Sequence, residues 1–117
     1  MTIKERRRAQ RVQADLAVTI VGERGEARGK ALNISSSGIY FESPYYVAPL
    51  TRIKLELLIP DPRAGESKVT CDGVVVRVEP ETKDPAVAIY RVAILFTLVP
   101  KSSLDVLDAY IRSRVSS

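Results

Sequence analysis

The sequence contains no histidine and a single cysteine, Cys71. Histidine is the most common general base and metal ligand near neutral pH, so its absence removes most acid–base and metal-dependent chemistry. A lone cysteine cannot form an internal disulfide or a cysteine-rich metal site. Cys71 lies in a strand-like run, and we interpret it as a small buried apolar side chain. We therefore expect no bound metal and no cofactor.

The usual catalytic signatures are also missing. Ser35, Ser36 and Ser37 have no histidine to activate them, and no Gly-x-Ser-x-Gly motif occurs. The carboxylates are scattered without paired spacing, and there is no glycine-rich phosphate loop of the Walker or Rossmann type. The sequence therefore predicts a protein that is not an enzyme.

Long hydrophobic runs are absent as well. A transmembrane helix needs roughly 18 or more consecutive apolar residues, and the chain has no such run. The first twenty residues are rich in charge and lack the apolar region of a secretory signal. We expect a cytoplasmic protein without membrane insertion. Its 117 residues, 45% of them hydrophobic, suffice for one domain with one core.

The net positive charge of the chain comes from its N-terminus. Residues 1–11 hold five lysines and arginines and one glutamate, whereas acidic and basic residues cancel over residues 12–117. Such a concentration of charge attracts phosphate-bearing partners and raises their encounter rate. The alternative interpretation is a flexible, solvated tail.

Most of the chain has the pattern of short strands joined by glycine- and proline-containing turns, typical of an antiparallel barrel or sandwich. The predicted strands are Asp15–Val21, Ala27–Ile34, Gly38–Glu42, Arg52–Ile59, Lys68–Val78 and Val87–Leu98. Turns or loops are expected at residues 22–26, 45–49, 60–65 and 79–85. Strict alternation places two sets of side chains each on one face: Val74, Val76 and Val78, and Tyr90, Val92, Ile94 and Phe96.

The C-terminus changes to a helical period. Ser102 is a candidate N-cap, with Asp105 three residues later in the position of a capping-box acid. One apolar stripe follows, made of Leu104, Leu107, Ile111 and Val115. We expect this helix to pack across the barrel opening.

Two arginines four residues apart, Arg7 and Arg11, precede the first predicted strand in the run Arg7-Arg8-Ala9-Gln10-Arg11. A guanidinium presents a planar fork of donors, suited to phosphate oxygens or to guanine O6 and N7. Any basic tail yields such a pair often, so the spacing alone is a weak indication of a ligand.

The segment Asn33-Ile34-Ser35-Ser36-Ser37-Gly38 is more specific. Asn, Ser and Gly all suit a tight turn, and a plain connection between two strands is one interpretation. The other is a ligand-binding surface. Alternation in an extended chain puts Asn33 and Ser35 on the same side, where both could hydrogen-bond a bound base.

In this order and at this separation the two motifs resemble RxxxR and [D/N]xSxxG, the ligand-binding signatures of PilZ domains. The resemblance extends from Glu5 to the C-terminal helix. It implies an all-β fold with a C-terminal helix, a six-stranded antiparallel β-barrel, and cyclic di-GMP as the ligand. We accordingly divide the chain into a basic N-terminal arm carrying RxxxR, residues 1–14, and a single barrel domain with its helix, residues 15–117.

The resemblance also implies roles for individual residues. Arg7 and Arg11 would grip phosphates and guanine edges, Asn33 would bond guanine, Ser35 would bond guanine or phosphate, and Gly38 would shape the turn. Secondary candidates for ligand contact are Arg6, Arg8, Gln10, Ser37, Gly73 and Arg77. The chain departs from the family at two positions: Asn33 replaces the usual aspartate, and Ala93 stands where many members have glycine.

The function expected from this pattern is a bacterial cyclic di-GMP receptor whose arm becomes ordered on binding and signals to a partner protein. One alternative is a PilZ-like adaptor that binds proteins without nucleotide. Another is a small nucleic-acid-binding barrel. The small number of aromatic residues and the balanced charge of residues 12–117 argue against nucleic acid.

Overall fold

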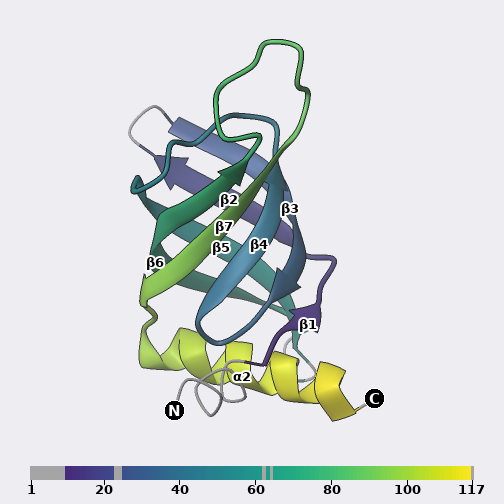
Figure 1. The fold of residues 1–117 in the computed structure, drawn as a ribbon. Helices are drawn as coiled ribbons and strands as arrows, with labels where there is room; N and C mark the ends of the chain where they lie inside the picture. Colours follow the sequence, from purple (N-terminus) through teal and green to yellow (C-terminus); the bar gives the residue numbers. More distant parts are fainter. Residues whose placement is uncertain (1–9, 23–24, 62, 64, 117) are drawn as a thin grey trace, which may run out of the picture.

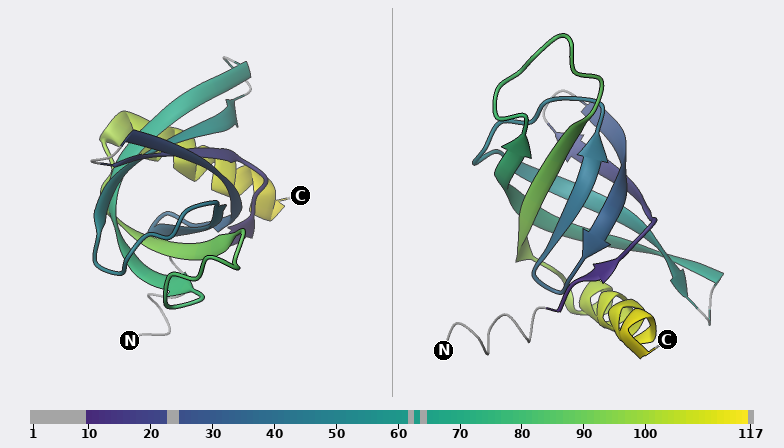
Figure 2. Two further views of the ribbon diagram at one scale, coloured as in Figure 1. Left: turned by 90° about the horizontal axis from the view of Figure 1, so that it is seen from above. Right: turned by 45° about the vertical axis from the view of Figure 1, so that its right-hand side comes forward.

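Six strands of the chain close into an antiparallel barrel (Figures 1 and 2). The computed structural model describes residues 10–22, 25–61, 63 and 65–116. Its elements are β1 (Val12–Gln13), β2 (Ala17–Gly22), β3 (Gly25–Ile34), β4 (Gly38–Ser43), β5 (Arg52–Asp61), β6 (Gly65–Glu79), β7 (Tyr90–Leu98) and α2 (Lys101–Ser116). The expected six-stranded barrel with a C-terminal helix is confirmed. Within this described part of the chain, no helix is long and apolar enough to cross a membrane.

The barrel closes because β3 pairs on both of its edges. The strands follow the order β3-β2-β5-β6-β7-β4, and the pairing of β4 with β3 completes the ring. The short strand β1 lies on β3 beside β2, and the Ala14 amide donates to the Leu32 carbonyl at 3.0 Å. Val12 and Ala14 are buried, so the described part of the expected arm from Val12 onward belongs to the barrel wall.

Alternation along the strands builds the core. Ile53, Leu55, Leu57 and Ile59 of β5 point inward, as do Tyr90, Val92 and Ile94 of β7. Several predicted boundaries were wrong. β2 and β3 pair as far as Gly22 and Gly25, and β5 and β6 pair as far as Asp61 and Gly65, so both connections are shorter than expected. β7 begins only at Tyr90, because the amide of Val87 bonds the carbonyl of Asp84 in a turn.

Two β-bulges reverse the inward and outward alternation. The register of β3 against β4 shifts between Ala31 and Asn33, so Ala31 and Ile34 are both buried. The register of β6 against β7 shifts between Val75 and Arg77, so Val75 and Val78 are both buried. An extra residue in one strand turns the following side chains to the opposite face.

The expectation that Val74, Val76 and Val78 share a face is therefore wrong. Val76 is 51% exposed, whereas Val78 is buried. The bulge in β6 lies at Val76, between Val75 and Arg77, and strict alternation holds only up to it.

Helix α2 crosses one end of the barrel and contacts β5, β6 and β1 (Figure 1). Its first hydrogen bond runs from the Leu104 amide to the Pro100 carbonyl, so Ser102 lies inside the helix and is not its N-cap. The buried stripe consists of Ser103, Leu107, Tyr110 and Ile111. Val115, expected in this stripe, is 45% exposed because the last turn extends past the barrel wall (Figure 2).

Leu50 has a left-handed backbone conformation with φ of 72°, and its side chain is 79% exposed. The Leu50 amide donates to the Val75 carbonyl, while the Val75 amide donates to the Thr51 carbonyl. Leu50 and Thr51 thus lie opposite the single residue Val75, as in a β-bulge whose first position favours glycine. A leucine in this conformation carries a steric cost that glycine would not have.

Replacing Leu50 by glycine is expected to raise the free energy of unfolding by about 0.5–1 kcal/mol, since relief of strain exceeds the entropy cost of glycine. Leu50→Ala is the matched control, because alanine keeps the Cβ atom that causes the strain. Urea denaturation of both variants measures the difference. Equal stability of the glycine and alanine variants would show that Leu50 is not strained.

Candidate functional site

A row of four side chains crosses the outer face of the barrel. Asn33 on β3 is paired with Tyr40 on β4, Tyr40 with Ala93 on β7, and Ala93 with Arg77 on β6. Neighbouring strands lie about 4.8 Å apart, so the row spans roughly 14 Å. These four residues line a pocket of about 440 Å³ together with Arg11, Ser37, Gly38, Ile39, Val76, Glu79, Ile94 and Leu95.

The two bulges place the polar ends of this row. Without the shift in β3, Asn33 would follow Ala31 into the core, and without the shift in β6, Arg77 would follow Val75. The small side chain of Ala93 lies between Tyr40 and Arg77, which leaves space above the sheet. Bulges recur next to functional sites because they re-aim side chains in this way.

The two sequence motifs meet at this pocket. Nη1 of Arg11 donates to Oδ1 of Asn33 at 2.7 Å, in an exposed hydrogen bond. Because a guanidinium only donates, the contacting atom of Asn33 is its oxygen, and its NH₂ group remains as a donor. Arg7 of the same motif lies outside the described residues. Among the described residues that line the pocket, Arg11 and Arg77 carry two positive charges beside the single carboxylate of Glu79.

Ser35 does not lie beside Asn33 on the pocket face. Its side chain is fully buried, and its hydroxyl accepts from the Ser37 amide at 3.2 Å and lies 3.1 Å from the Ser37 hydroxyl. Its amide donates to the Gly38 carbonyl at 2.9 Å. Alternation fails here because the strand ends at Ile34 and the chain turns. Ser35 holds the turn, and Ser37 lines the pocket.

Gly38 is required by the close approach of β4 to β7. A Cβ atom at this position would lie 2.4 Å from the carbonyl oxygen of Ile94, which is backbone and cannot move aside. Gly38 also lines the pocket, so the close contact of β4 with β7 lies at the site.

Tyr40 and Glu79 are pocket residues that were not predicted. The Tyr40 hydroxyl donates to Oε1 of Glu79 at 2.7 Å. This hydrogen bond, with some burial and the negative charge of Glu79, raises the pKa of Tyr40, while the positive charges of Arg91 and Arg77 act against the shift. Tyr40 alternates with the buried Ile39 and Phe41, a signal that could have placed it on the outer face.

The remaining predicted residues contribute less. Gln10 is exposed and is not among the residues lining the pocket. Gly73 is buried on the inner face, where a Cβ atom would lie 2.5 Å from Cγ2 of Ile94. Arg6 and Arg8, like Arg7, lie outside the described residues.

Cys71 is buried, in agreement with its interpretation as a core residue. Burial, with a smaller effect of the Asp72 charge, raises the pKa of the Cys71 thiol to about 12. The thiol is therefore protonated at neutral pH and is a poor nucleophile.

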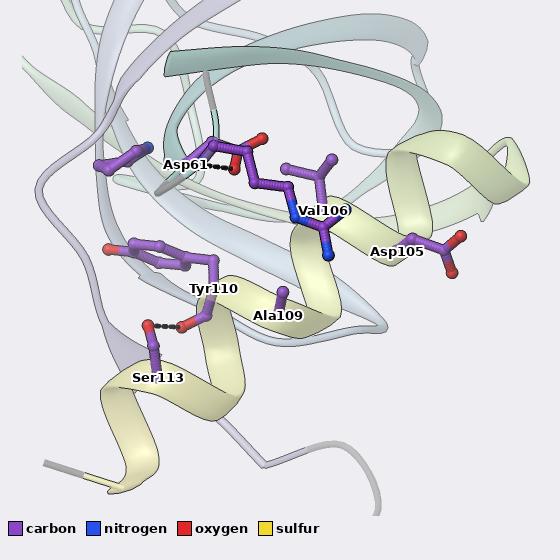
Figure 3. A pocket seen from close by; sticks show the side chains of 8 residues that line it. Asp61, Asp105, Val106, Ala109, Tyr110 and Ser113 are labelled. Atoms are coloured by element: carbon purple, nitrogen blue, oxygen red, sulfur yellow. Dashed lines mark hydrogen bonds between the residues drawn. The ribbon is translucent and has the colours of Figure 1, made fainter. Parts of the chain in front are cut away.

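A second pocket of about 380 Å³ lies between α2 and the end of β5 (Figure 3). Figure 3 shows the largely apolar side chains of Val106, Ala109 and Tyr110 along α2, with Asp61 and Asp105 at the same pocket. Arg63 is the one basic residue among the described residues that line it. Two carboxylates against one guanidinium make this pocket less suited to an anionic ligand than the one beside Arg11 and Arg77.

The comparisons with known proteins agree with this geometry. The family model of the PilZ domain matches residues 5–113. The chain therefore belongs to the PilZ domain family. A search of curated proteins finds no match.

Two solved structures show the same fold. The Bacillus subtilis inhibitor of motility (MotI/DgrA) has 22% identity and a TM-score of 0.77, with 96% of this chain and 53% of that chain covered. The chain thus spans about half the length of that protein. The PilZ domain of YcgR from Escherichia coli, solved with c-di-GMP, has 15% identity and a TM-score of 0.67, with 95% of this chain and 92% of that chain covered.

Proposed function

We propose that this protein is a receptor for cyclic di-GMP that acts without catalysis and passes the signal to a partner protein. The observation that carries the proposal is the contact between Arg11 and Asn33 at the edge of the pocket, which joins the two family motifs at one site. Membership of the PilZ family and the likeness to a domain solved with c-di-GMP support the same ligand.

The chemistry of the pocket suits this nucleotide. Cyclic di-GMP carries two phosphate anions and two guanines, which require cationic donors and hydrogen-bonding groups at one site. Arg11 and Arg77 supply guanidinium forks for phosphate oxygens or for guanine O6 and N7. A volume of about 440 Å³ is within the usual range for small-molecule sites.

Binding would act as a switch through the basic N-terminus. We propose that residues 1–11 close on the ligand, with Arg7 joining Arg11, while Val12 onward stays in the barrel wall. Ordering the chain costs about 1–2 kcal/mol per residue, offset by charge-assisted hydrogen bonds. The ordered segment would present a new surface to the partner. As the receptor of a bacterial second messenger, the protein would act in the cytoplasm.

Calorimetric titration with cyclic di-GMP tests the proposal, together with a variant that fills the pocket. The wild type is expected to bind with a Kd in the micromolar range or below, about −8 kcal/mol. Ala93→Ile should weaken binding by about tenfold or more, since a branched side chain between Tyr40 and Arg77 occupies the ligand's space.

Thr97→Ile is the matched control for this variant, because Thr97 is exposed on the same strand and is not among the residues lining the pocket. It should bind as the wild type does. A wild-type protein that gives no heat up to about millimolar ligand would favour the nucleotide-free adaptor instead.

A further inference from the structure

The carboxylate of Glu79 is the acidic group of the proposed ligand site. Of the described residues that line the pocket, Glu79 alone is acidic. It lies at the end of β6, where its cross-strand partner is Arg91 of β7, and Arg77 precedes it on the same strand. Arg91 is engaged in turn by Glu42, at 3.8 Å between Nε and Oε2.

Tyr40 holds this carboxylate at the pocket. Its hydroxyl, reaching from β4, bonds only Oε1 of Glu79, at 2.7 Å. A carboxylate has about four lone-pair sites on two oxygens, so among the described residues a single tyrosine leaves Oε2 and part of Oε1 free to accept. Tyr40 and Glu79 both line the pocket, so these free acceptor sites lie at its wall.

Guanine needs such an acceptor. Its N1–H and N2–H are neighbouring donors on one edge, and a carboxylate can accept both. The family residue for this purpose is an aspartate at the position of Asn33, but here the Asn33 oxygen already accepts from Arg11. One of the two lone pairs of this amide oxygen is therefore taken, so Asn33 has one acceptor site left for guanine, while its NH₂ donor suits guanine O6 or N7.

We propose that Glu79 determines base specificity by accepting from guanine N1–H and N2–H, with Tyr40 as the residue that positions its carboxylate. The inference rests on the proposed binding of cyclic di-GMP at this pocket. It assigns to Glu79 the paired acceptors that the single amide oxygen of Asn33 does not offer. Adenine presents an N1 lone pair in place of the N1–H donor, and a carboxylate would repel it, so cyclic di-AMP should be rejected.

The substitution Glu79→Gln distinguishes recognition of the guanine base from a general effect of the negative charge on nucleotide binding. A glutamine can accept from adenine N6–H while donating to adenine N1, but it accepts from guanine through one oxygen only. We expect its affinity for cyclic di-GMP to fall about tenfold or more and its affinity for cyclic di-AMP to rise. Loss of a negative charge alone would strengthen the binding of both nucleotides equally. The readout is therefore the dissociation constant for cyclic di-AMP divided by that for cyclic di-GMP.

Two further variants complete the experiment. Glu81→Gln removes the same charge from an exposed residue two positions along the chain that is not among the pocket residues, and it should leave the ratio unchanged. Tyr40→Phe keeps the ring but frees the carboxylate, and it should reduce the ratio severalfold. A role in barrel stability alone would shift the thermal midpoint of these variants without changing the ratio.

The outcomes are distinct. A collapse of the ratio in Glu79→Gln, with Glu81→Gln like the wild type, supports the assignment. Normal binding of cyclic di-GMP with an unchanged ratio in Glu79→Gln overturns it and leaves the proposed function intact. No binding of cyclic di-GMP by the wild type overturns both.

Discussion

Gly38→Ala is expected to lower the free energy of unfolding by about 3 kcal/mol, because the new Cβ atom overlaps the backbone of β7. It would lie 2.4 Å from the Ile94 carbonyl oxygen and 3.5 Å from Cα of Leu95. Neither strand can retreat without opening the pairing of β4 with β7, which runs from Gly38 to Ser43. Urea or thermal denaturation followed by circular dichroism measures the loss.

The control for this variant is Gly22→Ala at the end of β2. There the nearest atom to an added Cβ is the Gly25 carbonyl oxygen at 4.0 Å, an ordinary contact. We expect stability within about 0.5 kcal/mol of the wild type, since alanine is the better residue in a strand. If both variants were equally stable, β4 and β7 would not approach as closely at Gly38 as the structure has them.

Arg11→Ala is expected to weaken binding of cyclic di-GMP by about 1.5–3 kcal/mol, the scale of a hydrogen bond to a charged group. The change removes a guanidinium that lies at the pocket and already contacts Asn33. Arg7→Ala should have a similar effect, as the family motif implies. Arg11→Lys should not restore affinity, because an ammonium lacks the planar fork that contacts two acceptors at once. Calorimetry gives the dissociation constants.

Measuring the stability of the Arg11→Ala variant shows whether the loss of affinity is specific to the ligand site. The bond from Arg11 to Asn33 is exposed, so its loss should change the unfolding midpoint little. Arg52→Ala is the matched control, since Arg52 is exposed on β5 and is not among the residues lining the pocket. Equal affinity of the Arg11 and Arg52 variants for cyclic di-GMP would mean that the arginine motif does not bind this ligand.

The two departures from the family pattern have structural consequences. Asn33 is engaged by Arg11 through its oxygen, so it orients the arginine as well as facing the pocket. Ala93 lies in the row between Tyr40 and Arg77, where its single methyl group leaves the pocket open. Neither residue obstructs the site.

Residue pattern alone predicted an antiparallel barrel or sandwich with a C-terminal helix, and the resemblance to the PilZ family implied the barrel. Alternating apolar residues predicted strands with one buried face at Arg52–Ile59 and Val87–Leu98, and the structure has strands there with the bounds Arg52–Asp61 and Tyr90–Leu98. The change to a helical period after Pro100 marks the C-terminal helix. The strands and the helix can be recognised locally, because apolar residues spaced every two residues share one face of a strand, and those spaced about every 3.6 residues share one face of a helix. The two motifs contain Arg11, Asn33 and Gly38, which line one pocket in the structure, and their contact with a ligand stays a prediction.

Only the tertiary structure decided which faces those residues occupy. The bulges in β3 and β6 are register shifts against neighbouring strands, and no period within one strand reveals them. They turn Asn33 and Arg77 outward, while the turn after Ile34 buries Ser35. Tyr40 and Glu79 join the site because barrel closure brings β4 beside β7 and lets one hydroxyl reach β6. Cross-strand pairing between distant segments, and not local preference, assembles this pocket.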